Sequence, residues 1–107
     1  MVHIRYKHTA SDFKIEIKGH AGYAEYGKDI VCAGASTICS MLLIAADDAK
    51  AHGEIKVKTD KRCHGMVKLC YRYEKANSRV RYIAELVIEV YRMLAEEYPD
   101  NIKIESD

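Results

Sequence analysis

The chain has little net charge. Its 17 Lys and Arg residues are nearly cancelled by 16 Asp and Glu residues, which leaves a formal net charge of +1 over 107 residues. A dedicated nucleic-acid-binding domain carries a clear excess of positive charge. We therefore expect no direct binding of nucleic acid. Two groups of basic residues are interpreted as a solvated face of a sheet: Arg5, Lys7, Lys14 and Lys18, then Lys56, Lys58, Lys61 and Arg62.

The four cysteines form no C-x-x-C pair. They stand at Cys32, Cys39, Cys63 and Cys70, and Cys63 is directly followed by His64 instead of being spaced from it as in a zinc finger. This pattern argues against a structural metal site and a dithiol redox site, and we expect no metal and no other cofactor. The first seven residues lack the apolar core of a signal peptide. Free thiols and a reducing, cytoplasmic location are expected.

No run of apolar residues is long enough to predict a membrane span. The uncharged segment from Ile30 to Ala46 covers 17 positions and contains Gly34, Ser36 and other small polar residues, whereas a span needs ~20 predominantly apolar residues. We expect a buried helix and no membrane association. There is one proline, Pro99, and no repeat, linker or low-complexity tract. Residues 1–107 are therefore predicted to form one domain with one core.

The hydrophobic periodicity predicts an α+β fold. Apolar residues alternate with polar ones at 2–7, 13–18, 54–59 and 66–73, which indicates strands, with a connecting turn at 60–65. Helical spacing runs from Ile30 to about Lys50, and again from Asn77-Ser78 until Pro99 stops it. Ile102 and Ile104 add a candidate edge strand. The expected order is β-β-α-β-β-α(-β), an antiparallel sheet of four to five strands with two helices on one face.

The segment from Gly19 to Ser36 carries the chemistry. His20 lies where a strand pattern ends, and Asp29 is a candidate N-cap that places Cys32 in the first turn of the following helix. The free N–H groups and dipole at a helix N-terminus stabilise a thiolate, and a histidine within reach takes the thiol proton. These residues predict a cysteine nucleophile with a histidine base. Backbone N–H groups around Cys32 are the expected oxyanion donors.

Each of these assignments has a simpler alternative interpretation. A cysteine in an apolar helix is often a packed core residue, as Cys39 is expected to be. Asp29 either supports His20 or only caps the helix. Ser36, one turn after Cys32, either lines the substrate groove or bonds back to a backbone carbonyl. The histidine could be a surface residue beside a turn.

The loop of residues 21–28 is long for a strand-to-helix connection, which commonly has ~2–6 residues. A long loop beside a nucleophile is typical of a lid that orders on substrate binding. Gly22 and Gly27 are its permissive backbone points. Tyr23 and Tyr26 are expected to contact the side chains of the substrate.

At these residues the sequence resembles the ribosomal-processing cysteine protease (Prp) family. The resemblance rests on Gly19-His20-Ala21, on Glu25-Tyr26-Gly27 and on the run from Asp29 to Ser36. It implies a small cytoplasmic homodimer that trims a short N-terminal extension from a large-subunit ribosomal protein. The catalytic histidine and cysteine of the family match His20 and Cys32. The sequence departs from the family pattern at residues 22–24 and 28, and these differences concern substrate preference more than mechanism.

An alternative hypothesis is a non-enzymatic, dimeric, ribosome-associated interaction module in which Cys32 is only a core residue. Alkylation separates the two, because a catalytic Cys32 reacts with a thiol reagent at neutral pH much faster than the other cysteines. A redox or acyl-transfer thiol is the weakest interpretation, because the chain has no resolving cysteine at C-x-x-C spacing.

Overall fold

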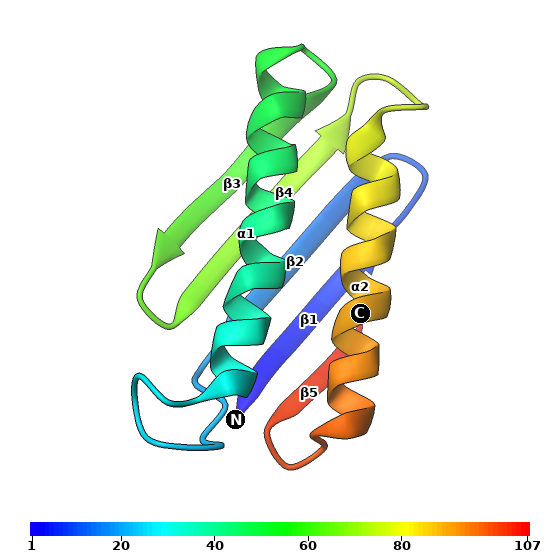
Figure 1. The fold of residues 1–107 in the computed structure, drawn as a ribbon. Coiled ribbons are helices and arrows are strands. Elements are labelled where there is room, and N and C mark those ends of the chain that lie inside the picture. Colours follow the sequence, from blue (N-terminus) through cyan, green and yellow to red (C-terminus); the bar gives the residue numbers. More distant parts are fainter.

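The computed structural model describes all residues from 1 to 107 and has the element order predicted from the sequence. The elements are β1 (Val2–His8), β2 (Asp12–Lys18), α1 (Ile30–Ala51), β3 (Ile55–Cys63), β4 (Met66–Tyr73), α2 (Arg79–Glu97) and β5 (Ile102–Ser106). The fold is α+β, and the candidate edge strand at 102–104 is confirmed as β5. Figure 1 shows both helices on one face of the sheet, with the other face uncovered.

The sheet is mixed, not purely antiparallel as expected. Its strand order is β3-β4-β2-β1-β5, and every neighbouring pair is antiparallel except β1 and β5, which are parallel. The reason lies in the connections. The hairpins β1–β2 and β3–β4 make antiparallel neighbours, whereas a helical crossover returns the chain to the end where the preceding strand began. Helix α2 therefore brings β5 in parallel to β4, and so parallel to β1.

The β3–β4 hairpin is longer than predicted, and the expected turn at 60–65 is wrong. Strand β3 continues to Cys63, which pairs with Met66, so that the turn contains only His64 and Gly65. Gly65 has a φ of +78°, a backbone conformation that suits glycine in a two-residue hairpin loop. The pairing of β3 with β4 therefore carries His64 to the tip of the hairpin. Gly19, just after β2, donates a hydrogen bond from its N–H to the Gly65 carbonyl at 2.8 Å.

The core lies between the helices and the sheet. Strands supply large buried side chains, among them Phe13, Leu69 and Tyr71, and α2 supplies Val87 and Tyr91. The buried side of α1 consists mostly of small residues, which lets the helix approach the sheet closely: Val31, Ala35, Cys39, Leu42, Ala46 and Ala49.

Helix α1 is long and apolar enough to cross a membrane by length and composition alone, a test that core helices of folded domains also pass. One side of α1 packs against the sheet and α2, which agrees with the prediction of a core helix. The opposite side leaves Ile30, Met41 and Ile44 exposed, and Ile44 is 70% accessible. The single chain therefore leaves the outer side of α1 uncovered.

Candidate active site

Cys32 lies in the first turn of α1, as predicted. The helix begins at Ile30, and the side chain of the N-cap Asp29 accepts a hydrogen bond from the Cys32 N–H at 2.8 Å. This bond fixes Cys32 at the third helical position, where the backbone surrounds its side chain with the positive end of the helix dipole. The helix start therefore holds the thiol at a defined place and orientation.

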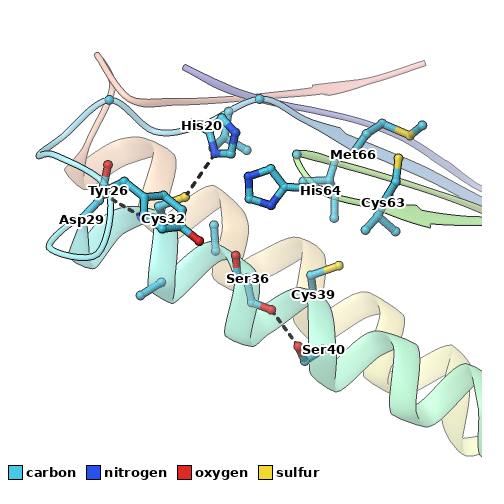
Figure 2. A pocket seen from close by; sticks show the side chains of 18 of the residues that line it. His20, Tyr26, Asp29, Cys32, Ser36, Cys39, Ser40, Cys63, His64 and Met66 are labelled. Atoms are coloured by element: carbon cyan, nitrogen blue, oxygen red, sulfur yellow. Dashed lines mark hydrogen bonds between the residues drawn. The ribbon is translucent and has the colours of Figure 1, made fainter.

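His20 meets Cys32 because the backbone just after β2 turns sharply. Gly19 has a φ of +96°, and a Cβ at this position would lie 2.4 Å from the Met1 carbonyl oxygen, so only glycine fits. The turn directs the His20 ring toward α1, and its Nδ1 lies 4.0 Å from the Cys32 Sγ (Figure 2). Catalytic hydrogen bonds are often this long without substrate and tighten in the substrate complex.

Asp29 acts as a cap and does not contact His20. Its second carboxylate oxygen accepts hydrogen bonds from the N–H groups of Tyr23 at 2.9 Å and Ala24 at 3.4 Å. Partial burial raises the pKa of Asp29, but these backbone hydrogen bonds outweigh it and hold the pKa below its ordinary value. Of the two roles left open for Asp29, the structure therefore shows capping. The same carboxylate ties the 21–28 loop to the start of α1.

The expected oxyanion donors beside the thiol are already occupied. The Cys32 N–H donates to the Asp29 side chain, and the Ala33 N–H donates to the Asp29 carbonyl at 3.0 Å. An N-cap side chain satisfies the N–H of the third helical residue by design, so these two groups are not free in this state. Other polar groups that line the pocket are therefore the candidate donors.

Ser36 offers one such donor. Neighbouring hydroxyls bond back to the helix: Thr37 donates to the Ala33 carbonyl at 2.8 Å and Ser40 to the Ser36 carbonyl at 3.0 Å. The Ser36 hydroxyl makes no such bond, and the residue lines the pocket on the same helical face as Cys32 (Figure 2). The groove-lining role is therefore the one that the structure supports for Ser36.

The pocket has a volume of about 740 Å³ and lies between the start of α1, the 21–28 loop and the tip of the β3–β4 hairpin. Gly22, Tyr26 and Gly27 line it, as predicted for the loop. Tyr23 does not, because its ring packs edge-on against Tyr98 at the end of α2, with the ring centres 5.5 Å apart. Of the two tyrosines expected to contact the substrate, Tyr26 lines the pocket and Tyr23 does not.

His64 is the residue that the sequence analysis missed. Its ring centre lies 5.1 Å from that of His20 and 6.2 Å from that of Tyr26, so it lies beside both His20 and the loop (Figure 2). Gly65 makes room for this arrangement, since a Cβ there would come within 3.3 Å of the His20 Nε2. The signal in the sequence was Gly65, because a glycine between two strand patterns marks a turn.

The other cysteines lack this environment. Cys39 is buried, as expected, and burial raises the pKa of its thiol. Cys70 lies on β4, and Cys63 is the last residue of β3 instead of part of a turn. No cluster of three or more His, Cys, Asp or Glu side chains is arranged to hold a metal ion.

Comparisons with known proteins agree on one family. The family model for the cysteine protease Prp matches residues 1–103 of the chain. No curated protein sequence matches the chain. Two solved structures with which the chain shares its fold are those of the ribosomal processing protease Prp from Staphylococcus aureus. One holds a covalently linked product peptide (23% identity, TM-score 0.72) and the other a substrate peptide (22% identity, TM-score 0.66), with all of both chains covered.

A third similar structure is that of SMU.848 from Streptococcus mutans, with 24% identity and a TM-score of 0.70 over 99% of this chain and 93% of that one. At these identities the structural likenesses establish the fold. The family itself is established by the match of its model over nearly the whole chain.

Proposed function

The chain belongs to the cysteine protease Prp family, and we propose that it is the endopeptidase that removes a short N-terminal extension from a large-subunit ribosomal protein during ribosome assembly. The observation that carries the mechanism is the 4.0 Å separation of the Cys32 Sγ and the His20 Nδ1 at the N-terminus of α1. The related Staphylococcus aureus protease is a ribosomal processing enzyme whose structures hold peptides, which supports a peptide substrate.

The proposed reaction has two stages. His20 takes the proton of the Cys32 thiol at Nδ1, and the thiolate attacks the carbonyl carbon of the scissile peptide bond. The tetrahedral intermediate collapses to an acyl-enzyme while His20 donates the proton to the departing amine. A water molecule, deprotonated by His20, then hydrolyses the thioester and frees Cys32. No metal and no cofactor takes part in these steps.

The shape of the pocket supports a peptide substrate. Small side chains at Ala33 and Ser36 keep the surface of α1 low beside Cys32, so that a peptide backbone can approach the thiol. Tyr26, 87% exposed, also lines the pocket and is available to contact substrate side chains. The free hydroxyl of Ser36 is the proposed donor to the oxyanion.

We also propose a cytoplasmic homodimer. Each helix carries one exposed apolar stripe on the outer surface of the helical layer: Ile30, Met41 and Ile44 on α1, and Tyr82, Leu86 and Met93 on α2. A second copy of the chain would remove this area from water. Light scattering of the wild type and of Ile44→Glu tests the dimer, and a monomeric wild type would contradict it. The four free thiols support a reducing compartment.

The test of the activity uses a synthetic peptide that spans the extension and the start of the mature ribosomal protein. We expect Cys32→Ser to lose cleavage by about 10³-fold or more, because removing a nucleophile disables the whole mechanism. Cys70→Ser is the matched control, since Cys70 lies on the uncovered face of the sheet. Mass spectrometry reads the products. Equal cleavage by Cys32→Ser and the wild type would contradict the proposal.

A further inference from the structure

The fold separates the charges of the chain onto two sides. We define the open sheet face as the side of the sheet that the helices leave uncovered (Figure 1). Ten basic side chains lie on it: Arg5, Lys7, Lys14, Lys18, Lys56, Lys58, Lys61, Lys68, Arg72 and Lys103. Five acidic side chains share it: Asp12, Glu16, Glu74, Glu105 and Asp107. The rest of the molecule therefore carries seven basic and eleven acidic residues. The net charge of +1 is therefore the sum of a strongly positive face and a negative remainder.

The strand register sets like charges directly opposite one another on this face. Three cross-strand pairs join two basic residues: Lys7 with Lys14, Lys56 with Arg72, and Lys61 with Lys68. No pair on the face joins two acidic residues. Like charges at facing positions destabilise a sheet, so these pairs work against folding. Opposite charges face each other in four further pairs on this face: Arg5 with Glu16 and with Glu105, Asp12 with Arg72, and Glu16 with Lys68.

The acidic residues leave several of these cations without a partner. The ion pairs on the face are Asp12 with Lys58, Glu16 with Lys18 and Lys68, Glu74 with Arg72, Glu105 with Lys103, and Asp107 with Arg5. Lys7, Lys14, Lys56 and Lys61 form no ion pair. Lysines on an edge strand such as β3 also discourage sheets from joining edge to edge. That explanation does not apply to Lys7 and Lys14, because they lie on the inner strands β1 and β2.

We infer that the open sheet face is a docking surface for the phosphate backbone of RNA. Phosphate groups supply the dense negative charge that these unpaired lysines lack. The face carries no Phe, Tyr or Trp side chain, and its one aromatic ring, that of His3, is too little to stack a run of unpaired bases. The RNA recognised is therefore a duplex, bound through its backbone without reading its sequence. This inference rests on the proposed function, which brings the protein to ribosomal components during assembly.

The position of this face allows RNA binding and catalysis to occur together. Cys32 lies on α1, on the helical side of the sheet, whereas the lysines alternate with the buried apolar residues of their strands and so lie on the other side. An RNA duplex on the open sheet face therefore leaves the peptide pocket accessible. The sequence-based expectation of no nucleic-acid binding came from the summed charge, which cannot show how the fold distributes it.

The experiment measures fluorescence anisotropy of a labelled RNA duplex of about 20 base pairs, longer than the ~16 that a double-stranded RNA-binding domain spans. We expect binding that weakens steeply with salt for the wild-type protein. The double variant Lys7→Gln/Lys14→Gln is expected to lower the slope of log K against log salt by about 2, because each phosphate-contacting lysine contributes about one unit. It also removes a like-charge pair, so its melting temperature should not fall, which excludes unfolding as the cause of weaker binding.

The matched control is Lys50→Gln/Lys75→Gln, which removes the same charge away from the open sheet face and should leave the slope unchanged. Both double variants are expected to cleave the substrate peptide at the wild-type rate, so RNA binding and proteolysis are read separately. Salt-independent binding, or equal loss in the two variants, would overturn the inference. So would binding of anionic lipid vesicles or of a polyglutamate peptide as tight as that of RNA, since either would assign the face to another partner.

Discussion

At the scale of single residues, the site depends on the approach of His20 to the Cys32 thiol. The two residues are twelve positions apart and belong to different elements, yet the left-handed turn at Gly19 and the Asp29 cap bring their side chains to 4.0 Å. Both the turn and the cap are formed by residues that are close together in the chain. The pair could therefore be predicted from the residues between Gly19 and Cys32.

The first prediction concerns the base. His20→Ala should lower the rate of peptide cleavage by roughly 10²–10⁴-fold, which is the usual contribution of a positioned general base. The rate of alkylation of Cys32 at neutral pH should fall as well, because the thiol loses its proton acceptor. Stopped-flow alkylation with mass-spectrometric assignment of the labelled cysteine measures this. An alkylation rate of Cys32 that is unchanged by His20→Ala would remove His20 from the mechanism.

The second prediction concerns His64 as a positioning residue. Its ring packs against that of His20, so His64→Ala should free the base to leave the thiol and lower kcat by up to ~10²-fold with little change in KM. His64→Phe keeps a ring at this place and should restore most of the rate. His3→Ala, on the open sheet face, is the control. A loss confined to KM, or none in His64→Ala, would contradict the positioning role.

At the scale of elements, the 21–28 loop and the start of α1 form one unit. The Asp29 carboxylate joins them through N–H groups of Cys32, Tyr23 and Ala24. The strand-to-helix loop was predicted as a lid because of its length and its glycines. Its attachment to the helix cap could not be predicted, because the sequence does not show which N–H groups bind the second carboxylate oxygen of an N-cap aspartate.

The third prediction follows from this attachment. Asp29→Ala should lower the melting temperature and increase hydrogen exchange in the 21–28 loop, because three backbone N–H groups lose their acceptor. Cleavage should fall too, since both Cys32 and Tyr26 are positioned by this unit. Asp48→Ala, in the last part of α1, is the comparison and should leave the exchange of the loop unchanged. Wild-type exchange of the loop in Asp29→Ala would contradict the proposed link.

At the scale of the whole molecule, the end of the sheet away from the active site contains a part-buried histidine. The His8 Nε2 lies 2.7 Å from the Tyr73 hydroxyl oxygen. The Arg81 guanidinium stacks on the Tyr73 ring at 3.9 Å from its centre. Burial, and then the charge of Arg81, lower the pKa of His8, although Glu85 opposes them. Protonation of His8 is therefore less favourable in the folded protein than in the unfolded chain.

The fourth prediction is the pH dependence of stability that results. As pH falls below the ordinary histidine pKa of 6.5, the unfolded chain takes up a proton at His8 that the folded protein does not, so stability decreases until the lowered pKa of the folded state is reached. Urea unfolding at about pH 7.5 and about pH 5.5 measures the decrease. His8→Gln should reduce this dependence, and an unchanged dependence would contradict the assignment to His8.

The order of strands and helices, the start of α1 at Asp29 and the pairing of His20 with Cys32 were predictable from the residue pattern. Alternation, helical spacing and capping act between residues near one another in the chain, so local sequence suffices for them. The long-range pairings were not predictable in the same way. The parallel contact of β5 with β1, the place of His64 beside His20 and the turn of Tyr23 toward Tyr98 join residues far apart in the chain.

The distribution of charge also shows the difference between what the local sequence pattern predicts and what tertiary packing determines. Composition states how many lysines there are, but the side to which each one points depends on strand register, and a shift of one residue moves every side chain of a strand to the opposite face. The register that sets Lys7 opposite Lys14 results from burial of the apolar side chains on the other face of the sheet, Ile4, Phe13 and Ile15 among them. Alternation along the strands already indicated a basic sheet face, but tertiary packing decided which cations face one another across it and turned Arg62, expected on that face, toward Asp47 of α1.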